Sequence, residues 1–93
     1  MSVKELNIEC TDDELKTAIN AAKSALDRTD SNQDRASFVR KAMDDRYGPA
    51  WSCVSGRDFG SELPYLPRHF AFFSVGDISF LVCKTSENVQ ITN

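Results

Sequence analysis

The chain has 93 residues, 41% of them hydrophobic and 27% charged, which is typical of one globular domain. Its 11 basic and 14 acidic residues give a net charge of −3, which argues against a surface for nucleic acid or anionic membranes. The stretch MSVKELNIE carries charges where a signal peptide would be apolar, and no apolar run is long enough to span a bilayer. We therefore expect a single domain over 1–93, with no nucleic-acid partner and no direct membrane insertion.

The cysteine content indicates a reducing environment. Cys10, Cys53 and Cys83 are odd in number and far apart in the chain, which argues against a disulfide framework. No C-x-x-C pair is present, so the sequence gives no support for a zinc site. These observations favour a cytoplasmic protein that needs neither a metal nor another cofactor.

The first part of the chain predicts a short segment and then a helix. Residues 1–10 are interpreted as a flexible arm or a short strand, with Leu6 and Ile8 on one face. Thr11, followed by Glu14 three residues later, is typical of a capping box at a helix start. Apolar residues then recur at helical spacing, which predicts one buried face. They are Leu15, Ala18, Ile19, Ala22 and Leu26.

A second helix is predicted from about Asn32 to Arg46. Gly48 and Pro49 end it, as a glycine C-cap followed by proline should. We expect its buried stripe to consist of Ala36, Val39, Ala42 or Met43, and Tyr47, with Phe38 at the edge.

The hydrophobic period then changes from helix to strand. Strands are predicted over 50–55, 69–75 and 78–84, and Gly76-Asp77 joins the last two as a two-residue hairpin turn. Residues 85–93 are interpreted as a polar tail. Two helices followed by strands predict an α+β fold, with the helices packed on an antiparallel sheet.

Aromatic side chains are expected on both faces of the strand over 69–75. Phe70 and Phe72 point one way and Phe73 the other, because side chains alternate along a strand. A sheet with aromatic residues on both faces is either buried on both or forms a contact surface.

The sequence contains two incomplete catalytic or metal-binding patterns, and the first is a calcium loop. Asp30, Asn32 and Asp34 have the spacing of the first calcium ligands of an EF-hand, but the required glycine and glutamate are replaced by Arg35 and Lys41. The same residues are explained by a helix start with acids in its first turn.

A nucleophile pair of Cys53 and His69 is conceivable from residue type alone. Both residues have hydrophobic neighbours in strands, and no oxyanion loop is evident. We therefore expect no enzymatic activity and no catalytic residues.

The segment over 56–68, between the strands predicted at 50–55 and 69–75, has glycines and prolines that disfavour pairing within its own sheet. Gly56 and Gly60 permit close backbone approach, and Pro64 and Pro67 lack an N–H. Such a segment can pair with the sheet of a second chain, leaving an edge that accepts an extended peptide. An irregular surface loop explains the same spacing.

The stretch RYGPAWSCVSGRDFGSEL, followed by HFAFFSVGDISFLVCK, resembles the small cytoplasmic dynein light chains over residues 47–84. The resemblance rests on a tyrosine, a proline, a tryptophan and a cysteine, then a glycine-arginine-X-phenylalanine-glycine-serine segment, then a histidine-phenylalanine strand. These residues are Tyr47, Pro49, Trp51 and Cys53, then Gly56, Arg57, Phe59, Gly60 and Ser61, then His69 and Phe70.

The resemblance implies a strand-swapped homodimer that binds short linear peptides and has no catalytic activity. In this family the peptide adds as a strand beside the swapped strand, in grooves at the dimer interface. Carried over by position, the peptide site comprises Asn32, Gln33, Phe59, Gly60, Ser61, Glu62, Leu63, Pro64, Tyr65, Phe70, Phe72 and Ser74. The dimer interface comprises Ser52, Val54, Gly56, Arg57, Asp58, Phe59 and Ser61.

The chain departs from the family pattern at positions of the interface and the groove. Ser52 stands where the family commonly has a histidine that makes its dimer sensitive to pH. Glu62 and Ser74 replace aromatic residues of the groove, and Pro64 removes an amide from the strand that should receive the peptide. We therefore predict no acid-driven dissociation from position 52, and a weak or altered peptide preference.

Two functions follow from the resemblance. The first is a cytoplasmic, cytoskeleton-associated module that binds peptides of partner proteins, among which the dynein intermediate chain is a candidate. The second is a structural dimerisation domain with a degenerate groove, as in the domain of this type that follows the EF-hands of flatworm tegumental proteins.

Overall fold

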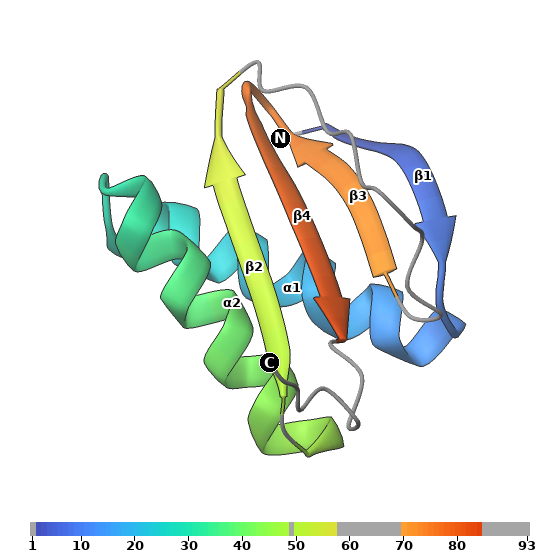
Figure 1. Ribbon diagram of the computed structural model, residues 1–93. Helices are drawn as coiled ribbons and strands as arrows, with labels where there is room; N and C mark the ends of the chain where they lie inside the picture. Colours follow the sequence, from blue (N-terminus) through green and yellow to red (C-terminus); the bar gives the residue numbers. More distant parts are fainter. Residues whose placement is uncertain (1, 49, 58–69, 85–93) are drawn as a thin grey trace, which may run out of the picture.

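Two helices cover one face of a four-stranded antiparallel sheet in the computed structural model (Figure 1). The structure describes residues 2–48, 50–57 and 70–84. In chain order the elements are β1 (Val3–Glu9), α1 (Asp12–Arg28), α2 (Asn32–Tyr47), β2 (Trp51–Gly56), β3 (Phe70–Val75) and β4 (Ile78–Lys84). The predicted α+β architecture is confirmed, and each predicted helix and strand is present with its ends shifted by at most one described residue.

The start of α1 has the predicted capping box. The Glu14 backbone N–H donates to Thr11 Oγ1, and the Thr11 backbone N–H donates to Glu14 Oε1, both at 3.1 Å. This reciprocal pair satisfies two of the amides that a helix start leaves without partners. It also explains why Glu14, an acidic residue, is buried in the fold.

The buried face of α1 is centred on small residues rather than on the larger ones predicted. Ala18, Ala21, Ala22 and Ala25 are the buried apolar residues of the helix, whereas Leu15, Ile19 and Leu26 are only partly buried beside the core. Alanine lets a helix backbone lie close to a neighbouring element, so the larger residues flank the line of contact. The predicted face was right, but Ala21 and Ala25 were missed.

The second helix starts and stops where capping residues predict. Ser31 Oγ accepts from the Asp34 backbone N–H at 3.2 Å, and Gly48 closes the helix with a positive φ of 83°. Val39 and Met43 are the buried residues of the predicted stripe, and Phe38 packs beside the core from its edge. The interpretation of 30–41 as a helix start is therefore confirmed.

The amino-terminal segment forms an edge strand, but one expectation about it is wrong. The register of β1 on β3 shifts between Glu5 and Asn7, which is the signature of a β-bulge. Leu6 lies at this bulge and is 44% exposed, while Ile8 packs against the core. Leu6 and Ile8 therefore do not share a buried face, because the extra residue of the bulge interrupts the alternation.

The sheet has the strand order β1-β3-β4-β2, with α2 packed against β2 and α1 against β3. The core lies between this sheet and the helices, and aromatic residues stack inside it: the rings of Phe73 and Phe80 lie 5.6 Å apart. The β3–β4 turn at Gly76-Asp77 is the predicted two-residue hairpin, with Gly76 at a φ of 61°. Neither helix has the length and apolar content needed to cross a membrane.

Candidate functional site

The face of the sheet opposite the helices carries six described strand residues assigned to peptide binding or dimerisation: Ser52, Val54, Gly56, Phe70, Phe72 and Ser74. Ala71, Phe73 and Val75 point into the core, so Phe70, Phe72 and Ser74 point outward. The predicted opposite orientation of the phenylalanines in β3 is thus what the structure has. We call this surface the outer face.

The pairing registers place these residues in rows across three strands. From β2 through β4 to β3 the rows are Ser52, Cys83 and Phe70; Val54, Leu81 and Phe72; and Gly56, Ser79 and Ser74. Residues assigned to the dimer interface on β2 therefore lie on one face with residues assigned to the groove floor on β3. The β4 residues between them were missed from sequence, although the alternation of 78–84 contained the signal.

The side chains of the outer face become more exposed toward the β2 edge of the sheet. Phe70 and Leu81 are buried although they lie outside the main core cluster, and Phe72 is half-buried. Val54, at the β2 edge, is 51% exposed and is one of two large apolar residues exposed in the described part of the chain. The most exposed apolar side chain of the outer face therefore lies at its β2 edge.

The edge formed by β2 is open within the described part of the sheet. Its one described pairing partner is β4, and no described strand bonds to its other side. An edge strand presents a row of backbone N–H and C=O groups that a further strand can satisfy. Among the described residues, β2 therefore has a strand partner on one side only.

The start of α2 lies near the end of β2. The Ser55 hydroxyl donates to Asn32 Oδ1 at 3.4 Å, and Arg35 Nη1 donates to the same oxygen at 2.9 Å. Gln33, the other helix residue assigned to the peptide site, is exposed. Asn32 and Gln33 therefore stand at the end of the β2 edge, on the helix side.

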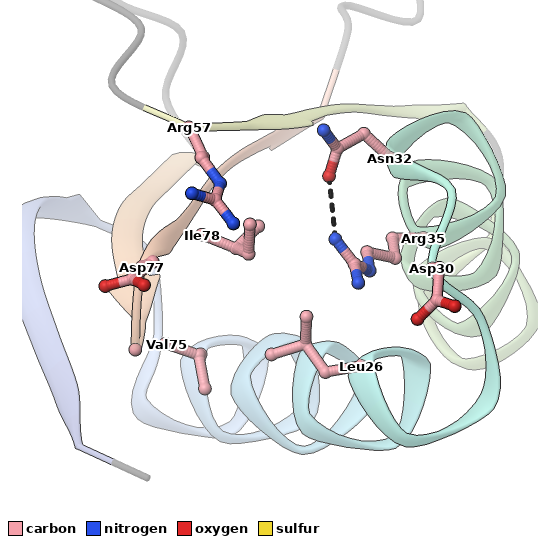
Figure 2. A pocket seen from close by; sticks show the side chains of 9 residues that line it. Leu26, Asp30, Asn32, Arg35, Arg57, Val75, Asp77 and Ile78 are labelled. Carbon is pink, nitrogen blue, oxygen red and sulfur yellow. Dashed lines mark hydrogen bonds between the residues drawn. The ribbon is translucent and has the colours of Figure 1, made fainter.

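Arg57 is separated from the other described residues of the predicted dimer interface. Ser52, Val54 and Gly56 face outward, whereas Arg57 follows Ser55 on the helix side and lines a cavity of about 570 Å³ (Figure 2). The remaining predicted positions, Asp58 and Phe59 to Tyr65, lie outside the described residues, as does His69.

Cys10 and Cys53 have the properties of structural cysteines. Burial raises the pKa of Cys53 to about 12, with a smaller contribution from the nearby Cys83. Burial and the neighbouring carboxylates, Glu14 first, raise the pKa of Cys10 to about 11. A thiol with such a pKa stays protonated at neutral pH and is a poor nucleophile. No group of three or more His, Cys, Asp or Glu able to hold a metal occurs among the described residues.

Comparison with known proteins gives one family and one fold. The family model described as dynein light chain type 1 matches residues 2–85. Two solved structures of the dynein light chain-like domain of the Fasciola hepatica calcium binding protein FhCaBP2 are similar to this chain. The mercury derivative has a TM-score of 0.76 and covers 94% of this chain and 97% of its own, and the native form has a TM-score of 0.77 and covers 91% and 92%; both are 20% identical in sequence.

Proposed function

The chain belongs to the dynein light chain type 1 family, and we propose from this that it is a dimeric module which binds short linear peptides of partner proteins. Family membership supports a role as a protein-interaction module. The family is generally non-catalytic. It also suggests an association with the cytoplasm or the cytoskeleton. We propose in addition that the chain dimerises by strand exchange and that it binds peptides by β-augmentation.

The observation that supports the proposal is the edge of β2, which has no partner among the described strands and carries the exposed Val54 on the outer face. A swapped strand from a second chain would add to this edge and satisfy its backbone groups. The added strand would lie beside Val54. It would extend the rows Val54–Leu81–Phe72 and Gly56–Ser79–Ser74 at their β2 end. A peptide would then add beside the swapped strand, with Asn32 and Gln33 near one end of the groove.

The oligomeric part of the proposal is tested by sedimentation equilibrium of the purified chain. We expect a dimer, and we expect Val54→Asp to shift it to a monomer, because the substitution places a charge in the contact. Leu6→Asp is the matched control, since Leu6 is the other large exposed apolar residue but lies on β1. A wild-type monomer, or equal effects of the two substitutions, would contradict the proposal.

Acid should leave this dimer intact. Ser52 has no titrating group, so we expect the same mass at about pH 7.5 and pH 5, across the range in which histidine titrates. Dissociation in this range that persists when His69 is replaced by Gln would contradict the prediction.

Peptide binding is tested by calorimetric titration with a peptide that has a threonine-glutamine-threonine core. Pro64 removes one ladder hydrogen bond, and each such bond contributes roughly up to a tenfold change in affinity. We therefore expect saturable binding with a Kd weaker than about 10 µM. Tighter binding would show that Glu62, Pro64 and Ser74 leave the peptide preference unaltered.

A second candidate is a structural dimerisation domain with a degenerate groove. Pro64 and Glu62 favour it, because they remove a donor and add a charge in the segment that should receive the peptide. The chain shares its fold with a domain of a calcium binding protein. We therefore propose, under this second candidate, that the chain acts beside EF-hands in a tegumental protein. A dimer with no saturable binding at about 1 mM peptide, in calorimetry and in pull-down, would select this candidate.

A further inference from the structure

A cavity of about 570 Å³ opens at the end of the molecule where α1 passes into α2 beside the β3–β4 hairpin. It lies on the helix side of the sheet, away from the outer face (Figure 2). Its lining combines apolar residues with residues of both charges. The residues are Leu26, Asp30, Asn32, Arg35, Arg57, Val75, Gly76, Asp77 and Ile78.

Arg57 places a guanidinium group inside this cavity. Its side chain extends from the end of β2 toward Ile78 (Figure 2). Within the described ranges, Arg57 takes part in none of the ion pairs, which join Arg40 to Asp44, Lys41 to Asp45 and Arg46 to Asp13. No described carboxylate therefore competes with a ligand for its charge.

Arg35 supplies a second guanidinium in a fixed orientation. Its Nε donates to the Thr29 carbonyl oxygen at 3.1 Å, and its Nη1 donates to Asn32 Oδ1 at 2.9 Å. These bonds hold the planar group at the cavity wall and leave Nη2 for a further acceptor. An acceptor there would meet a donor that has already lost most of its rotational freedom.

The acidic residues of the lining leave these positive charges unpaired. Asp77 turns its carboxylate away from the cavity, and Asp30 stands at the rim (Figure 2). In the part of the chain that the structure describes, neither forms an ion pair with Arg35 or Arg57. The lining also has apolar side chains: Ile78 lies beside Arg57, and Leu26 and Val75 lie across the cavity from it (Figure 2).

We propose that this cavity binds a carboxylate attached to an apolar group. The carboxylate oxygens accept hydrogen bonds from Arg57 and Arg35, because guanidinium groups match carboxylates in shape and charge. The apolar group contacts Leu26, Val75 and Ile78, because apolar side chains of a binding cavity favour contact with an apolar ligand over contact with water. This chemistry is offered by the carboxyl-terminal residue of a partner protein and by a small aliphatic acid.

The test is an NMR titration of the full chain with N-acetyl-leucine, with N-acetyl-leucinamide as the matched neutral ligand. For a ligand of this size we expect a Kd of about 1 mM for the acid and at least about fivefold weaker binding of the amide. Methyl signals of Leu26, Val75 and Ile78 should shift with saturation. Equal affinities for acid and amide, or shifts confined to other residues, would overturn the proposal.

The residue assignment is tested with Arg57→Gln against Arg40→Gln. Arg40 is an exposed arginine of α2 that does not line the cavity. We expect Arg57→Gln to weaken N-acetyl-leucine binding at least about fivefold and Arg40→Gln to leave it unchanged. Equal effects of the two variants would show that the carboxylate does not bind at Arg57.

Two further ligands distinguish a small aliphatic acid from a protein carboxyl terminus, and one variant separates this cavity from the proposed dimer. Hexanoate stands for the aliphatic acid, and a pentapeptide ending in a free leucine carboxylate stands for the protein terminus. Tighter binding of either one identifies the source, and failure of both overturns the site. Val54→Asp should retain the cavity and its affinity as a monomer, so a failed dimer prediction would leave this site testable.

Discussion

The two faces of the sheet differ in what their aromatic residues do. On the helix side, Phe73 is fully buried and stacks on Phe80, and α1 and α2 close over both. On the outer face, Phe72 is half-buried and its row ends at the exposed Val54. Adjacent residues of one strand thus belong to surfaces with different roles. Folding depends mainly on the helix side, and we assign association to the outer face.

The largest expected effect distinguishes these faces with a matched pair of substitutions. Phe73→Ala should lower the free energy of unfolding by about 3–5 kcal/mol, because it leaves a cavity in a close-packed core. Phe72→Ala should lower it by about 1–2 kcal/mol, because the ring already contacts solvent in part. Urea unfolding monitored by circular dichroism measures both.

The two positions should have the opposite order of effect in an association assay. If the outer face forms the dimer, Phe72→Ala weakens dimerisation in sedimentation, whereas Phe73→Leu, which keeps a large apolar side chain in the core, leaves it unchanged. Equal costs of the two alanine variants in unfolding would break the distinction between the faces.

A smaller effect is expected at the helix start, far from the outer face. Thr11→Ala removes the acceptor of the Glu14 amide and should lower the free energy of unfolding by about 1 kcal/mol. Thr11→Ser keeps the hydroxyl and should therefore retain most of the wild-type free energy of unfolding. Dimer affinity should be unchanged in both variants. A change in dimer affinity would show that α1 is coupled to the association surface.

The smallest effect concerns the ion pair that joins the two helices at the surface. Tyr47 Oη donates to Asp13, and Arg46 lies 3.3 Å from the same carboxylate. These hydrogen bonds, that of Tyr47 first, hold the pKa of Asp13 below its usual value of 3.8. A lowered pKa means that the stabilisation is present above the unfolded pKa and is lost as pH falls through the folded pKa.

Asp13→Asn should therefore lower the urea midpoint slightly at pH 7, and its difference from wild type should disappear as pH falls through the lowered pKa of Asp13. Asp12→Asn is the control, because Asp12 lies in the same first helical turn but forms none of these bonds. A difference between Asp13→Asn and wild type that does not change with pH would show that the carboxylate charge contributes nothing.

Much of the fold was predictable because it depends on local patterns. Thr11, Ser31 and Gly48 have the cap chemistry that sets helix ends, and Gly76-Asp77 fits a two-residue turn. Alternation in 69–75 was enough to place Phe70 and Phe72 opposite Phe73. The bulge at Leu6 was not predictable, since it depends on how β1 pairs with a strand more than 60 residues away.

The candidate site was predictable only where a motif matched the family. That match supplied Ser52, Val54, Phe70 and Phe72, which the structure places on one face. It also grouped Arg57 with them, whereas strand alternation puts Arg57 on the helix side. Residues 58–65 remain predictions, because they lie outside the described residues.

By itself, the sequence determined the element types, their caps and the sidedness of each strand, because these depend on neighbours within a few residues. The tertiary structure alone decided the strand order β1-β3-β4-β2, which places β2 at one edge of the described sheet. It also decided that Arg35, Arg57 and the β3–β4 hairpin meet around one cavity. Such meetings depend on long-range packing, and no spacing along a single chain encodes them directly.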